Sequence, residues 1–167
     1  GLAIPATPDA LRAGGEAFLT EAFHRFGSLA ADNSVVKITR FEPHIAGSSG
    51  LKISLSVEYL RNDPNLHRDL FVKFSRNFHE GHRDRRRFEL ESEIRLAMLS
   101  RLPAFPIRVA APYFAYFQRE TGTGLLITER IPYGNGDILP FQHKCMDHEL
   151  ADPLAFYRAL ISALAKL

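Results

Sequence analysis

The chain of 167 residues is 46% hydrophobic and 24% charged, which is typical of one globular domain and argues against a disordered, collagen-like or coiled-coil chain. Its formal net charge of +2 is too small to indicate a nucleic-acid partner, because nucleic-acid binders usually carry a strongly basic face. The sequence has neither a run of about 18 apolar residues nor a secretory signal pattern, so we expect no membrane partner.

The first element expected is a helix over residues 8–26. Its apolar residues recur at the spacing of one helical face, and they are Leu11, Phe18, Leu19, Ala22, Phe23 and Phe26. Gly27 follows as the expected stop. Residues 1–34 are therefore predicted to form a leading helical segment.

A β-hairpin is expected next. Val36, Ile38 and, later, Ile45 stand among alternating polar residues, which indicates a first strand. Residues 51–59 alternate strictly between apolar and polar, as in an antiparallel strand with one buried face. The small residues at 46–50 then form the turn that joins the two strands.

A third strand and a long helix follow. Residues 69–75 place Leu70, Val72 and Phe74 on one face and Lys73 on the other. A helix is predicted from about residue 84, and Pro103 ends it. The residues at helical spacing are Phe88, Arg95, Leu96, Leu99 and Leu102, of which the three leucines are expected to anchor the helix to the sheet.

Two more strands and a last helix complete the pattern. Residues 112–118 and 124–131 are predicted strands across a turn at 119–123. We therefore expect an α+β fold with a five-stranded antiparallel sheet and one long packed helix. Asp152-Pro153 starts a trailing helix, whose apolar face comprises Leu154, Tyr157, Leu160, Ile161, Leu164 and Leu167. An apolar stripe that ends without a cap predicts a domain cut from a longer protein.

The order of these elements is one that phosphoryl-transfer enzymes use. Backbone N–H groups in the small-residue turn can approach phosphate oxygens. Lys73, which faces away from the apolar side of its strand, can reach two phosphates as a point charge. Glu93, twenty positions later, would orient that lysine, with Glu89 and Glu91 as the alternatives.

The chain resembles the aminoglycoside phosphotransferase and choline kinase group of the protein-kinase-like fold, especially its ecdysteroid-kinase-like branch. The resembling segments occur in family order over residues 35–134; they are AGSSG at 46–50, DLFVKF at 69–74, FELESEIRLAML at 88–99 and PYFAYFQRETGTGLLITERIPYG at 112–134. The resemblance implies that residues 35–134 are the nucleotide-binding N-terminal lobe. Residues 135–167 would then be a post-hinge linker and the start of a second lobe.

The same resemblance implies particular roles. Lys73 and Glu93 form the catalytic ion pair, and residues 128–131 form the hinge that hydrogen-bonds adenine. The expected nucleotide-binding residues are Gly47, Ser48, Ser49, Gly50, Phe71, Lys73, Thr128, Glu129 and Ile131. The partners are ATP, magnesium (Mg2+) and a small-molecule acceptor that the sequence does not identify.

The family's catalytic aspartate, asparagine and metal-binding aspartate belong to the second lobe, and none is found in this sequence. The chain is therefore expected to be the ATP-binding part of a small-molecule kinase, inactive by itself. The alternative is a non-catalytic, pseudokinase-like module that binds a partner through its trailing helix. Neither the oligomeric state nor the nucleotide preference follows from the sequence.

Three other motifs are set aside. His82-Arg83-Asp84 spells a kinase catalytic tripeptide but precedes the helix instead of following the hinge. Residues 76–87 contain five arginines, which we interpret as a solvated loop rather than an RNA site. Residues 143–148 lack the second ligand pair that a zinc site needs. The single Cys145 permits no internal disulfide and suits a reducing compartment, so we expect a cytoplasmic protein.

Overall fold

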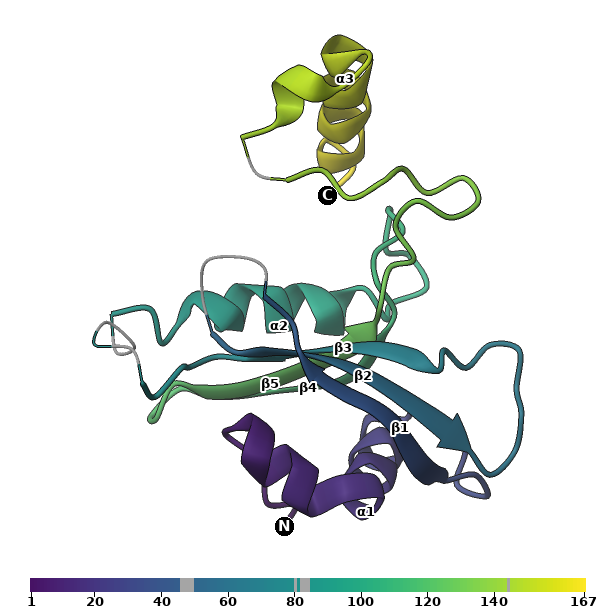
Figure 1. Cartoon of the computed structure of the whole chain (residues 1–167), viewed down its shortest axis with the longest axis vertical. Coiled ribbons are helices and arrows are strands. Elements are labelled where there is room, and N and C mark those ends of the chain that lie inside the picture. Colours follow the sequence, from purple (N-terminus) through teal and green to yellow (C-terminus); the bar gives the residue numbers. More distant parts are fainter. Residues whose placement is uncertain (46–49, 80, 82–84, 144) are drawn as a thin grey trace.

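The computed structural model describes residues 1–45, 50–79, 81, 85–143 and 145–167. Within them, the fold is α+β, as predicted, with five antiparallel strands in one sheet. The elements in chain order are α1 (Pro8–Phe26), β1 (Val35–Pro43), β2 (Lys52–Tyr59), β3 (Asp69–Phe74), α2 (Glu89–Leu99), β4 (Pro112–Gln118), β5 (Thr123–Glu129), a short 3-10 helix (Asp147–Glu149) and α3 (Pro153–Leu164). Helices α1 and α2 cover opposite faces of the sheet (Figure 1), which we call the α1 face and the α2 face.

The strand order is β1-β2-β3-β5-β4, and every neighbouring pair is antiparallel. Strand β5 therefore lies between β3 and β4, although β4 precedes it in the chain. The first three strands are neighbours in sequence order, and the first two pair as predicted. Residues 46–49 lie outside the described residues, but their flanks pair as a hairpin, because the His44 N–H donates to the Lys52 carbonyl at 2.9 Å.

The α1 face holds the main hydrophobic core. Leu70, Val72 and Phe74 of β3 are fully buried there, as their alternation with polar residues predicts. Helix α1 has the predicted bounds, and the six apolar residues expected to face the core are its buried residues. Thr7 caps its first turn, and Gly27 ends it with a φ of 71°, a left-handed conformation that glycine adopts without strain.

The predicted core face of α2 is wrong. The helix begins at Glu89 rather than near residue 84, and Leu96, Leu99 and Leu102 are exposed. The side chains that it buries are Leu90, Ile94 and Ala97, which pack on Leu126 of β5 and on Ala115 and Phe117 of β4. This buried stripe is spaced by four and then three residues, which fits one helical face as well as the predicted spacing of three and three does.

The ends of two predicted strands also differ from the structure. In β1, Val35 is the buried residue, while Val36 is 48% exposed and Ile45 lies beyond the strand, fully exposed. Two irregularities in the pairing of β1 with β2 cause this shift, because each bulge changes which residues face the core. Strand β5 ends at Glu129, so Ile131 belongs to the following loop.

Helix α3 starts where the sequence predicts, with the Asp152 carboxylate accepting from the Ala155 N–H at 2.9 Å. It stands apart from the sheet (Figure 1), and none of its residues is buried. The predicted apolar face of α3 is therefore exposed, and its Tyr157 hydroxyl donates to the Asp147 carboxylate at 2.7 Å. Across the described residues, no helix combines the length and hydrophobicity that crossing a lipid bilayer requires.

Candidate functional site

The α2 face of the sheet presents polar side chains in regular rows. Antiparallel pairing sets Lys52 opposite Lys73, Ser54 opposite Phe71 and Ser56 opposite Asp69, and directly opposed residues point to the same face. Helix α2 packs on the β4 and β5 part of this face. The candidate site therefore lies on β2 and β3, beside the helix.

Lys73 and Glu93 form an ion pair in which the Lys73 Nζ donates to the Glu93 Oε1. Lys73 comes from the middle of β3, and Glu93 comes from the face of α2 next to the buried stripe. The lysine side chain is 15% exposed and the glutamate 45% exposed, so solvent screens the pair and its contribution to stability is small. The ion pair fixes a position, because the Glu93 carboxylate holds the Lys73 ammonium group between β3 and α2.

The two alternative glutamates are held by arginines instead. Glu89 accepts from Arg86 at 2.6 Å. Glu91 accepts from Arg95 at 2.7 Å and lies 3.2 Å from Arg119 in the β4–β5 turn. Of the three glutamates, Glu93 is therefore the one that meets Lys73.

Gly50 lies two residues before the start of β2, in the loop that leads to Lys52. Its φ of +65° falls in the left-handed region, which L side chains rarely adopt. The Lys52 ammonium donates to the Gly50 carbonyl at 3.1 Å, so this lysine folds back toward the loop. Gly47, Ser48 and Ser49, predicted to contact phosphates, lie outside the described residues.

Phe71 is half-buried beside the lysines and contacts a histidine that the sequence analysis missed. The His44 ring meets Phe71 edge-on, with centroids 5.2 Å apart, and its Nδ1 lies 3.1 Å from the hydroxyl of buried Ser54. The signal for His44 is its position just ahead of the glycine turn, which returns it to the sheet next to β2. Phe71 and His44 offer an aromatic surface on which a planar ring can stack.

The predicted hinge is only partly available for adenine. Thr128 shares the α2 face with Phe71, its cross-strand partner. The Glu129 N–H, however, donates to the Ala111 carbonyl at 2.8 Å, and the Ile131 carbonyl accepts from Tyr133 at 3.0 Å. Backbone groups of residues 128–131 are thus used within the chain, which reduces the hydrogen bonds that the hinge can offer.

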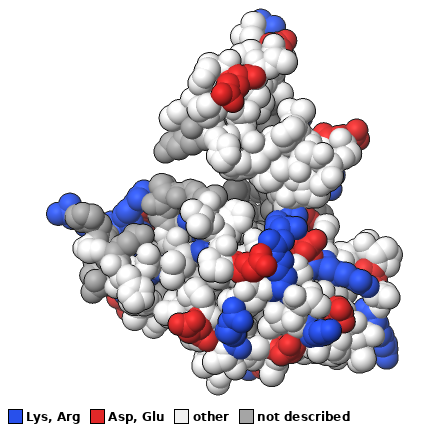
Figure 2. Space-filling view, viewed as in Figure 1, with Lys and Arg blue, Asp and Glu red and all other residues white. Residues whose placement is uncertain are grey.

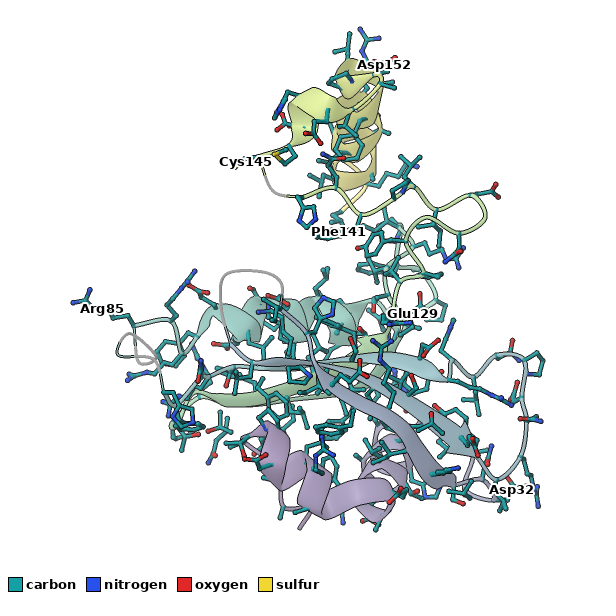
Figure 3. The ribbon with its side chains drawn as sticks, viewed as in Figure 1. Asp32, Arg85, Glu129, Phe141, Cys145 and Asp152 are labelled. Carbon is teal, nitrogen blue, oxygen red and sulfur yellow. The ribbon has the colours of Figure 1, made fainter. Side chains whose placement is uncertain are left out.

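The Glu129 side chain points away from the candidate site. It is buried on the α1 side of the sheet, where Leu70 is its cross-strand partner, and its Oε2 lies 2.6 Å from His67 Nε2. Figure 3 labels Glu129 where β5 ends and the chain leaves the sheet. Glu129 therefore fits a structural role for its side chain, and any contact with a nucleotide would come from its backbone.

Two buried tyrosines, Tyr59 and Tyr113, lie next to the Glu129–His67 pair and form a polar cluster with it. The Tyr59 hydroxyl donates to the His67 carbonyl at 3.0 Å, and the Tyr113 hydroxyl accepts from the His67 N–H at 2.5 Å. Burial raises the pKa of Tyr59 strongly above its ordinary value, and Tyr113, close by, raises it further. Burial is also the main cause of the raised pKa of Tyr113. The cluster joins the β2–β3 loop to the ends of β4 and β5.

The three motifs set aside in the sequence lie in or next to segments that the structure describes only in part. Among the described residues, no group of three or more His, Cys, Asp or Glu side chains is arranged to hold a metal ion. Residues 82–84 lie outside the described residues. In the arginine segment, Arg86 pairs with Glu89 and Arg87 stacks on Phe88 at 4.7 Å. On the face in Figure 2, basic and acidic side chains are interspersed over the sheet.

Comparison of the chain with protein-family models, with curated proteins and with solved structures finds no match. The α2 face of the sheet carries the side chains whose chemistry points to a function. That face combines a lysine oriented by a carboxylate, a second lysine opposite it, a glycine at the loop junction and an aromatic surface. Such a set suits an anionic ligand that also carries a planar ring.

Proposed function

We propose that residues 35–134 are the ATP-binding lobe of a kinase that transfers the γ-phosphoryl group of ATP to a hydroxyl of a small molecule. The observation that carries the proposal is the ion pair between Lys73 of β3 and Glu93 of α2 on the α2 face of the sheet. An oriented lysine on a strand beside a glycine-containing hairpin is the arrangement that protein-kinase-like enzymes use to hold nucleotide phosphates. The resemblance of the sequence to small-molecule kinases supports the same assignment.

In this proposal each residue of the site has a distinct task. Lys73 donates to oxygens of the α- and β-phosphates, and Glu93 keeps its ammonium group from turning into solvent. Phe71 and Thr128 lie beside the adenine ring of ATP. Because the acceptor oxygen bonds to the γ-phosphorus as the bond to the β-phosphate oxygen breaks, ADP leaves and the acceptor proton goes to a base. That base and the Mg2+ ligands are expected in a second lobe.

The test is nucleotide binding to the chain and turnover by the intact protein. Lys73→Met is expected to abolish turnover and to weaken ATP binding while the chain stays folded. The matched control is Lys37→Met, because Lys37 is an exposed lysine on β1, away from the pair. Unchanged ATP binding and turnover in Lys73→Met would contradict the proposal.

A second candidate is a non-catalytic binding or regulatory module. The observation that favours it is the exposed apolar face of α3, which includes Leu160, Ile161 and Leu164. The module predicts that the chain self-associates through α3 and that Leu160→Glu abolishes this association. Light scattering of the two proteins over a range of concentrations measures it, and a monomeric wild-type chain would count against this second function.

A further inference from the structure

We propose that the outer edge of β4 is an interaction surface at which two copies of this chain pair, β4 against β4, so that one antiparallel sheet runs through both. This pairing does not depend on the proposed function, because β5 separates β4 from the strand that carries Lys73. The two edge strands of the sheet, β1 and β4, differ in the hydrogen bonds that their outward-pointing backbone groups make.

The outer edge of β1 is covered by α1. Three side chains of this helix, spaced four residues apart, bond backbone groups of β1; they are Arg12, Glu16 and Thr20. Arg12 donates to the Phe41 carbonyl at 3.1 Å, and Glu16 accepts from the Ile38 N–H at 2.9 Å. These bonds occupy backbone groups that an added strand would use, so α1 closes this edge to pairing.

The outer backbone groups of β4 belong to Ala115 and Phe117. Phe117 stands opposite Gly124, whose N–H and carbonyl both bond Ser75 on the β3 side, at 2.8 and 3.0 Å. Directly opposed antiparallel residues either exchange both hydrogen bonds or exchange none, so the N–H and carbonyl of Phe117 point away from β5. Ala115, two residues earlier, has the same orientation. Within the described part of the chain, no hydrogen bond reaches these outward donors and acceptors.

The sequence of β4 does not protect this edge. Its residues, PYFAYFQ, include no charge, and the proline stands at the first position. The Tyr113 carbonyl accepts from Ser28 at 2.6 Å, so the open part of the edge begins at Ala115. An uncharged, aromatic edge strand of this kind is a template for another strand.

A second copy of β4 bonds all of these groups in one register. When two β4 strands pair antiparallel about Tyr116, Ala115 of each copy stands opposite Phe117 of the other, and every outward N–H and carbonyl of both residues is bonded. The two Tyr116 side chains then face each other in the closer, non-hydrogen-bonded type of pair, where aromatic contacts stabilise a sheet. A pairing centred on Ala115 or on Phe117 would instead use Tyr113, whose carbonyl is already bonded, or Arg119 in the turn.

Helix α2 fits the same arrangement. It rests on Ala115 and Phe117 of β4 and on Leu126 of β5, so its axis lies between these two strands. Pairing of β4 with β4 places the two α2 axes two strand spacings apart, which is about 10 Å and matches the usual distance between packed helices. Met98 lies on the flank of α2 opposite Glu93, toward the β4 edge, and is 48% exposed. It is therefore placed to contact the α2 helix of the second copy.

The first experiment measures the molar mass of the full chain by light scattering over a range of concentrations, with circular dichroism to show that each variant is folded. The wild type is expected to be a dimer. Tyr116→Lys sets two like charges opposite each other, and Ala115→Pro removes an outward N–H without removing a bond to β5. Both variants should have the mass of one chain. The matched control Val36→Lys adds the same charge at an exposed residue of the other edge strand and should remain a dimer.

The second experiment tests the register in a Cys145→Ser background. After mild oxidation, Tyr116→Cys should give a disulfide-linked dimer, because the two positions face each other with Cα atoms about 4.5 Å apart. Gln118→Cys is the matched control, since Gln118 is exposed on the same face. Its two copies would lie about 14 Å apart along the strands, too far for a disulfide.

A monomeric wild type overturns the proposal. A dimer that persists in Tyr116→Lys overturns it as well, and because Tyr116 is exposed, this variant decides even where Ala115→Pro does not fold. Loss of the dimer in Leu160→Glu would assign the association to α3 instead. Equal disulfide formation in Tyr116→Cys and Gln118→Cys would contradict the two-fold register. Nucleotide binding plays no part in these measurements, so their failure leaves the proposed function to its own test.

Discussion

A Cβ added to Gly50 would lie 1.9 Å from the carbonyl oxygen of Phe74. The loop between β1 and β2 is therefore in contact with the end of β3 at the residue after Lys73. The approach leaves no space for a side chain, and the positive φ of Gly50 adds a second reason for glycine. The loop junction and the lysine are thus held together by backbone contact.

Gly50→Ala is expected to lower the free energy of unfolding by at least about 2 kcal/mol, because it combines backbone strain with a clash against a carbonyl. Urea denaturation measures the change. The control is Gly27→Ala, since Gly27 has a similar φ of +71° but only an ordinary contact at 3.4 Å. That variant should lose about 1 kcal/mol, and equal losses in the two variants would show that the contact with Phe74 is unimportant.

Glu93→Gln is expected to weaken ATP binding about tenfold, because the neutral amide no longer orients the Lys73 ammonium. The matched control is Glu91→Gln, two positions earlier on the same helix, where the carboxylate contacts Arg95 and Arg119 instead. Binding of a fluorescent ATP analogue compares the two. Equal effects in both variants would mean that helix charge, and not the pair with Lys73, controls binding.

Measurements of stability alone can test which face of α2 packs on the sheet. Ile94→Ala is expected to cost about 3 kcal/mol, because Ile94 is buried against the sheet and its truncation leaves a cavity. Leu99→Ala should change stability by no more than about 0.5 kcal/mol, because Leu99 is exposed. Denaturant titrations of both variants decide between the two helix faces, and a larger cost for Leu99→Ala would restore the face predicted from sequence.

Stability is expected to fall at alkaline pH because of two buried tyrosines. Folding raises the pKa values of Tyr59 and Tyr113 above the ordinary value of 10.0, so both side chains are neutral in the folded protein where the unfolded chain ionises. Their contribution is fully present below about pH 10 and is lost as the pH rises above it. Thermal midpoints from about pH 8 to about pH 12 should show this fall.

The variant Tyr59→Phe tests whether the tyrosines cause the loss of stability at alkaline pH. Since this variant has one ionisable group fewer in the cluster, its thermal midpoint should decline less steeply with pH than that of the wild type. The Tyr59 hydroxyl donates to the His67 carbonyl, so some stability is lost at neutral pH as well. A decline parallel to the wild type would assign the alkaline sensitivity to other groups.

Strands β2 and β3 and helix α1 were predictable because each carries one dominant pattern. In the two strands the apolar residues alternate without interruption, and α1 has an N-terminal cap, a terminal glycine and one buried stripe. Helix α2 was not predictable in the same way, since its apolar residues fit two faces: Leu90, Ile94 and Ala97 on one, and Leu96 and Leu99, continued by Leu102 beyond its end, on the other. Which stripe packs is decided by the surface of β4 and β5, which a local pattern does not describe.

Some residues of the candidate site could be predicted from the sequence and others could not. Lys73 follows from its place opposite the apolar side of its strand, and Glu93 was preferred from the resemblance to kinases. In the structure, Glu89 and Glu91 pair with arginines and Glu93 does not. One of these arginines, Arg119, comes from the β4–β5 turn, which the local sequence around α2 does not reveal. His44 and Lys52 were missed because their neighbours depend on the register of the hairpin, which periodicity does not specify.

The position of β5 between β3 and β4 has a consequence for synthesis. Strands β1, β2 and β3 can pair as soon as they leave the ribosome, because they are consecutive in sequence and in space. The other edge of β3 has no partner until residue 129 has emerged, about fifty residues later. During that interval the edge that carries Lys73 is open to pairing with other chains, so the nascent protein is most prone to aggregate just before its sheet is completed.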